Sequence, residues 1–60
     1  MNLENMTDIE LREALQDAER LMDKYDAIGS MIAFDRAREV YLAIEVELLL
    51  REQEGRLQVG

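Results

Sequence analysis

The chain has 60 residues, with 14 acidic against 7 basic side chains and a formal net charge of −7. It contains no Cys and no His, which excludes disulfides and removes the usual zinc ligands and the commonest acid–base and covalent catalytic groups. Nucleic-acid binding needs a basic surface, so direct binding of nucleic acid is not expected.

So short a chain allows one small domain, residues 1 to 60. A domain of this size buries only about 60% of its unfolded surface and usually needs disulfides, a metal or oligomerisation as support. The first five residues lack the features of a signal peptide and are expected to be loose, although Leu3 could pack. The apolar run from 40 to 50 is shorter than the roughly 20 residues that span a bilayer. We therefore expect a cytoplasmic protein that does not enter a membrane.

A first helix is predicted from about residue 8 to residue 28, because both of its ends are marked. Thr7 and Glu10 fit a capping box, in which each side chain accepts a hydrogen bond from the backbone of the other. Gly29 is suited to the left-handed conformation that ends a helix, and Ser30 can cap the next one. Between the two ends, apolar residues form one stripe: Leu11, Ala14, Leu15, Ala18, Leu21, Met22, Tyr25 and Ile28.

A second helix is predicted from about residue 31 to residue 54, followed by a flexible tail, residues 55 to 60. At about 100° per residue its apolar positions form two stripes on roughly opposite sides. The stripe expected to face the first helix contains Ala33, Phe34, Ala37, Val40, Tyr41, Ile44 and Leu48. The second stripe, named here the outer stripe, contains Met31, Ile32, Leu42, Ala43, Val46, Leu49 and Leu50. Glu47 and Arg51 form a favourable i,i+4 pair near the helix end.

A β-hairpin made of residues 43 to 50 and 56 to 59 is the competing interpretation. Residues 44 to 48 alternate between apolar and acidic with a period of two, as strands do. The helical composition before residue 43 and the weakness of a lone two-stranded hairpin in water favour the helix. The predicted fold class is therefore all-α: a two-helix antiparallel hairpin that pairs as a homodimeric four-helix bundle.

The outer stripe is the main clue to function. Burying Leu42, Val46, Leu49 and Leu50 would contribute roughly 6–10 kcal/mol, which is comparable with the whole stability of a small domain. A second copy of the chain, or another protein with an apolar or basic groove, is expected to cover them. Alternatively, Leu57 and Val59 in the tail fold back over part of the stripe. The predicted interface residues are Leu42, Val46, Leu49, Leu50, Ile32 and Ala43.

The leading functional hypothesis is a small acidic interaction protein that regulates or inhibits another protein by steric binding. By analogy of architecture alone, short acidic hairpins occur as kinase inhibitors, antitoxins and phage proteins. One alternative is an acidic mimic of nucleic acid, of the phage or anti-defence type, that blocks a basic channel. Another is a structural subunit of a larger assembly. No enzyme activity, cofactor, small-molecule ligand or metal is expected, and Glu10, Glu13 and Asp17 are interpreted as a solvated helix face.

Overall fold

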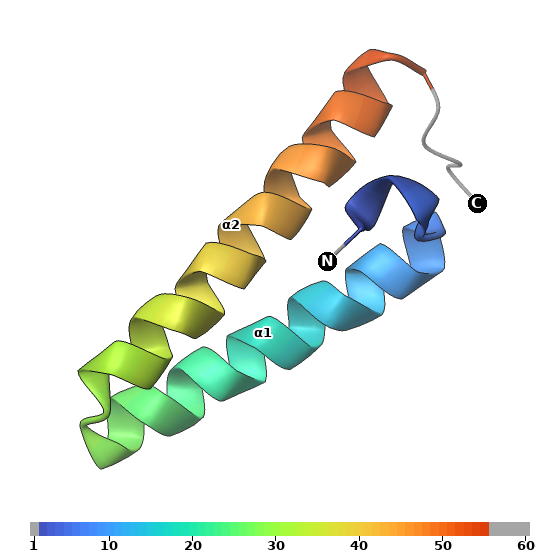
Figure 1. Cartoon of the computed structure of the whole chain (residues 1–60). Helices are drawn as coiled ribbons and strands as arrows, with labels where there is room; N and C mark the ends of the chain where they lie inside the picture. The colour runs from blue at the N-terminus through green and yellow to red at the C-terminus, as the bar shows by residue number, and fades with distance from the viewer. Residues whose placement is uncertain (1, 56–60) are drawn as a thin grey trace.

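The computed structural model describes residues 2–55, and the regular secondary structure within them is all helical. A short 3-10 helix, η1 (Leu3–Asn5), precedes two α-helices, α1 (Asp8–Ile28) and α2 (Met31–Gln53). The two long helices run antiparallel and pack against each other (Figure 1). This arrangement confirms the predicted helical hairpin.

The helix bounds agree closely with those predicted. The second helix ends one residue earlier than expected, at Gln53, and Gly55 follows it with a φ of 72°. The β-hairpin alternative is wrong, because residues 43 to 53 belong to one uninterrupted helix. The proposed tail contacts of Leu57 and Val59 fall outside the described residues.

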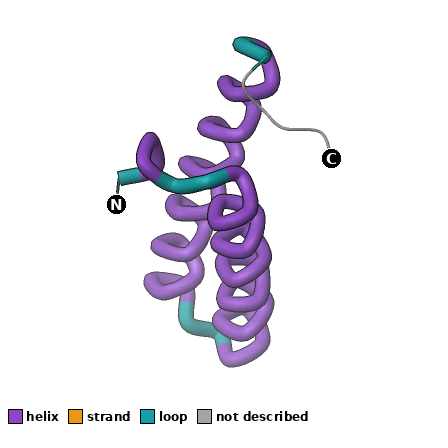
Figure 2. Tube along the Cα trace, turned by 90° about the vertical axis from the view of Figure 1, so that its right-hand side faces the viewer, coloured by secondary structure: helices purple, strands orange, loops and turns teal. Residues whose placement is uncertain are grey.

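Near the start of α1 the chain turns back toward α2, so that η1 lies at the open end of the hairpin. α1 and α2 lie closest beside their connection and diverge away from it (Figure 1). Figure 2 shows the segment before α1 leading across to α2, and η1 contacts α2. Within the segment 1 to 5 that was expected to be loose, Leu3–Asn5 instead form η1, and Leu3 is half-buried, as the sequence allowed.

The capping box fixes the start of α1. The backbone N–H of Glu10 donates to the Thr7 hydroxyl at 3.1 Å, and the backbone N–H of Thr7 donates to the Glu10 carboxylate at 2.9 Å. These bonds satisfy two N–H groups that the helix itself leaves without partners. The first turn of α1 is thus defined by contacts within four residues of sequence.

Acid should weaken this cap in a defined way. The pKa of Glu10 is lowered, chiefly because the backbone N–H of Thr7 donates to it. Its contribution to stability is therefore complete above the ordinary glutamate pKa of about 4.3 and is lost as the pH falls through the lowered value. We expect Glu10→Gln to melt a few degrees below the parent chain at pH 7 and level with it once the pH is below the lowered pKa of Glu10. Thermal melts followed by circular dichroism test this, and a difference independent of pH would contradict it.

The end of α1 matches its prediction, but the cap of α2 does not. Gly29 has a φ of 75°, and the N–H groups of Gly29 and Ser30 donate to the carbonyls of Asp26 and Tyr25 at 3.2 and 2.9 Å. This is the Schellman arrangement, which favours glycine because only glycine enters the left-handed region without strain. Ser30 occupies the N-cap position of α2, yet its side chain makes no capping bond. The ψ angle of Ser30 is 87°, whereas that of Thr7 is 163°. Ser30 therefore does not have the extended backbone conformation that Thr7 has in the capping box of α1.

The core between the helices is narrow. Leu11 and Ile44 are the only large side chains that are fully buried among the described residues. Ala18 and Ala37 complete the buried apolar set. The stripes predicted to form the core are wider than this. Their outlying members Leu21, Ile28 and Val40 are exposed, because a single neighbouring helix covers only the middle of each stripe.

Candidate protein interface

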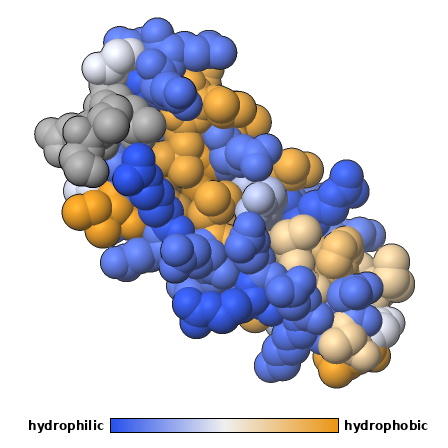
Figure 3. Space-filling model, turned by 180° about the vertical axis from the view of Figure 1, so that it is seen from behind, coloured by the Kyte–Doolittle hydropathy of each residue, from blue (hydrophilic) through white to orange (hydrophobic). Residues whose placement is uncertain are grey.

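The outer stripe lies open on the surface of α2. Ile32 has an exposed fraction of 76% and Val46 one of 55%, and Leu42, Leu49 and Leu50 are each between 42 and 49% exposed. Figure 3 shows hydrophobic surface, interrupted by hydrophilic side chains, over the end of the molecule that carries the second half of α2. The hairpin therefore buries one side of α2 and leaves the other uncovered.

Helix geometry explains why these side chains cannot reach the core. Residues 37, 44 and 51 are the buried positions of α2, and they are spaced by seven. At 100° per residue, Leu42, Val46 and Leu49 lie on roughly the opposite side of the helix axis. Ala43 and Leu50 lie at one edge of that sector, and both are exposed. No rotation of α2 against α1 would bury both sides at once.

Arg51 is the buried residue that was not predicted as part of the core. Its Nη1 lies 2.7 Å from Asp8 Oδ1, and its Nε lies 3.0 Å from Glu47 Oε1. Its Nη2 donates to the carbonyls of Leu3 and Met6, at 3.0 and 2.7 Å. One guanidinium thus joins α2, the first residue of α1 and the η1 segment. We call this group the Arg51 cluster.

The Arg51 cluster is shielded from water. The side chains of Arg51, Asp8 and Glu47 are only 9, 17 and 14% exposed. The pKa of Arg51 is raised, first by its hydrogen bond to Asp8 and then by its bond to Glu47, although burial acts in the opposite direction. The charge on Arg51 is therefore permanent at any pH at which the chain is folded.

Part of the Arg51 cluster could be predicted from the sequence. The Glu47–Arg51 pair was predicted from its i,i+4 spacing, and it is formed. The position of Arg51 seven residues after Ile44 places it on the buried side of α2. The contacts to Leu3, Met6 and Asp8 could not be predicted, because they depend on how the chain folds back over more than 40 residues.

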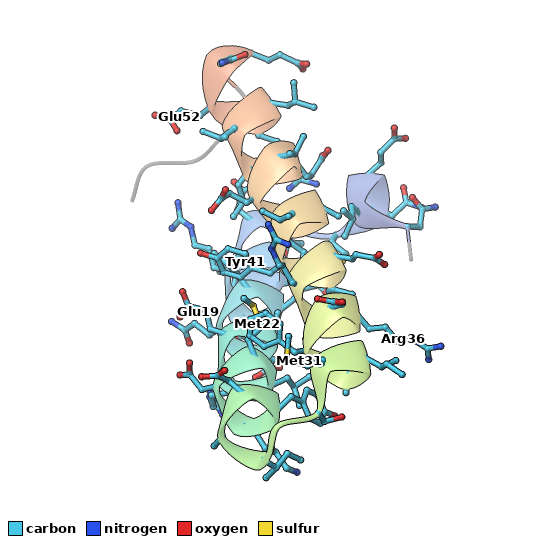
Figure 4. All side chains as sticks on the ribbon, turned by 90° about the vertical axis from the view of Figure 1, so that its left-hand side faces the viewer. Glu19, Met22, Met31, Arg36, Tyr41 and Glu52 are labelled. Carbon is cyan, nitrogen blue, oxygen red and sulfur yellow. The ribbon has the colours of Figure 1, made fainter. Side chains whose placement is uncertain are left out.

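A second polar contact crosses the hairpin nearer the connection. The Tyr41 hydroxyl on α2 donates to Glu19 on α1 at 3.5 Å, and Figure 4 shows both side chains near Met22. An open hollow beside this contact is also lined by Met22 and Asp23. The pKa of Tyr41 is raised, first by burial and then by the charges of Glu45 and Glu19. Tyr41 therefore keeps its proton at neutral pH and acts as a hydrogen-bond donor between the helices.

Charged side chains border the outer stripe. Arg36, Arg38 and Glu52 are exposed, and none of them forms an ion pair with another described residue. Asp35 and Glu39 lie within the angular range of the stripe, before its continuous apolar part. The stripe thus has both basic and acidic side chains near its beginning, and acidic ones, Glu45, Glu47 and Glu52, beside its middle and end.

The described residues include neither a candidate metal site nor a candidate membrane-spanning helix. Residues 2–55 contain no group of three acidic side chains placed to hold a metal ion, and Glu10 is engaged in the capping box. Neither long helix combines the length and apolar character that crossing a bilayer requires. No known protein family matches the chain, and no curated protein or solved structure was found to be similar to it.

Proposed function

We propose that the chain is a small interaction protein whose binding surface is the outer stripe. A second copy covers this stripe, so that two hairpins form a four-helix assembly with the two α2 helices at its centre. The observation that carries the proposal is the exposure of Leu42, Val46, Leu49 and Leu50 on the side of α2 opposite the core. These four side chains lie within nine residues of one helix and form one continuous apolar segment.

The energetic balance of a lone hairpin supports this proposal. Among residues 2–55, only two large side chains are fully buried between α1 and α2. Full burial of such a side chain contributes about 1.5–3 kcal/mol, whereas the four large residues of the outer stripe could contribute roughly 6–10 kcal/mol. A two-fold dimer uses the same surface on both copies, so one stripe is sufficient to make the interface.

The assembly would act on other proteins through its remaining surface. The chain carries a net charge of −7, which favours association with a basic partner and speeds the encounter. We place it among small regulators or inhibitors that act by occupying a surface rather than by catalysis. The alternative, mimicry of nucleic acid, has less support, because exposed Arg12, Arg20 and Lys24 interrupt the acidic side of α1.

Sedimentation equilibrium at micromolar concentration tests the dimer directly. The parent chain, of 7.0 kDa, is expected to sediment with twice that mass. Val46→Asp should weaken self-association by about a hundredfold or more, because it removes apolar burial from both copies and buries two carboxylates. Circular dichroism should show that the helices persist in the variant.

Ile9→Asp provides the matched control. Ile9 is also exposed, at 69%, but it lies on α1 away from the outer stripe. This change should leave the two-chain mass unaltered. A monomeric parent chain with a cooperative thermal transition would overturn the dimer, and an unchanged mass for Val46→Asp would show that the outer stripe is not its interface.

A further inference from the structure

We infer that the two copies pair antiparallel through α2, with the two-fold axis beside Val46, and that charged residues flanking the outer stripe set this direction. The inference rests on the dimer proposed above and adds its geometry. It follows from where charge lies on α2 relative to the apolar segment, residues 42 to 50.

The apolar segment is suited to pairing about its own centre. Residues 42 to 50 span about 12 Å of helix at 1.5 Å per residue, and Val46 is the middle residue. When two such segments lie antiparallel about Val46, Leu42 of one copy is level with Leu49 and Leu50 of the other. The helices then overlap from about residue 38 to residue 54. Ile32 lies beyond this overlap, which makes the interface narrower than the predicted stripe.

One pair of flanking charges, Arg38 and Glu52, is complementary in this arrangement, whereas Glu45, between them in angle, lies beside its own copy near the axis. Arg38 and Glu52 are 14 residues apart, so they differ by only about 40° around the helix axis and lie on the same flank of the stripe. In an antiparallel pair, the same flanks of the two helices meet. Arg38 of one copy lies within about two residues, roughly 3 Å along the axis, of the level of Glu52 of the second copy. Both side chains are long enough to span this offset, and the symmetry axis generates the contact twice.

A parallel pairing would bring like charges together. In register, it places Glu39 beside Glu39 and Asp35 beside Asp35 within the stripe itself. The antiparallel pairing instead sets Glu39 level with Gln53, which is uncharged. Like-charge contacts disfavour an interface, and complementary flanking charges select partner orientation in paired helices.

Cysteine cross-linking distinguishes the two directions, because the chain has no native Cys. Glu39→Cys and Gln53→Cys chains of different mass are mixed under mild oxidation, after each is shown to dimerise. Antiparallel pairing should form the mixed 39–53 disulfide at least about tenfold faster than either self-disulfide, because a disulfide needs Cα atoms within about 7 Å. Dominant self-disulfides would overturn the antiparallel direction while leaving the dimer intact. Absence of any dimer by sedimentation would instead refute the proposed function.

A charge exchange tests the flanking contacts themselves. Arg38→Glu and Glu52→Arg should each weaken self-association by up to about tenfold, since each disrupts two symmetric contacts. The double exchange should restore the affinity of the parent chain. Failure of the double exchange to restore affinity would contradict this register.

Discussion

Replacing Arg51 with Met is expected to lower the melting temperature by on the order of 10 °C, the largest effect of any charge removal in the chain. Asp8 and Glu47 would lose their shared cation while both side chains stay mostly shielded from water. The carbonyls of Leu3 and Met6 would lose a donor as well. Removing one member of a buried ionic group is costly because the remaining charges keep their desolvation penalty. Thermal unfolding followed by circular dichroism measures the effect.

Arg20→Met is the control for that change. Arg20 pairs with Asp17 at 3.7 Å, but both side chains are more than two-thirds exposed. An exposed pair contributes little, so this variant should melt within about 2 °C of the parent chain. Asp8→Asn and Glu47→Gln, added to Arg51→Met, should recover part of the loss because no buried charge then remains. Equal effects of Arg51→Met and Arg20→Met would show that the Arg51 cluster contributes no more than a surface pair.

Ile44→Ala is expected to reduce the free energy of unfolding by about 2–5 kcal/mol. Ile44 is fully buried and, with Leu11, forms the centre of the packing between α1 and α2. A domain of this size has little stability to lose, so the variant should be partly unfolded under conditions in which the parent chain is folded. Urea titration at one fixed protein concentration gives the difference.

Val40→Ala is the matched change at the edge of the same stripe. Val40 has an exposed fraction of 40%, so less apolar area and no closed cavity are involved. Val40→Ala should reduce the free energy of unfolding by less than about 1 kcal/mol. If Ile44→Ala reduced the free energy of unfolding as little as Val40→Ala does, Ile44 would not be at the centre of the core.

Local sequence signals predicted the hairpin well, because they act over a few residues. Thr7 and Glu10 fix the start of α1 through bonds between neighbours, and Gly29 ends it through its own backbone freedom. Ser30 shows the limit of such reasoning. Its residue type suits a cap, but its backbone angles follow from the Schellman turn before it, and its hydroxyl makes no capping bond.

The Arg51 cluster could not be predicted in the same way. Periodicity places Arg51 on the buried side of α2, but charge alone favours a position in water. Hydrogen-bond acceptors near the start of the chain reverse that preference. They are the Asp8 carboxylate and the carbonyls of Leu3 and Met6. The outer stripe is exposed as its angular position requires, and its role as an interface stays a prediction.

The hydrogen bonds from Arg51 to the carbonyls of Leu3 and Met6 connect the end of α2 to the segment that precedes α1. Helix ends normally fray by themselves, one turn at a time, at almost no cost. Here the last turn of α2 cannot open without releasing η1 and the first residue of α1, which lie 43 to 48 positions away in sequence. The last turn of α2 and the η1 segment should therefore unfold cooperatively. Backbone amide protons in these two segments should exchange with solvent at similar rates.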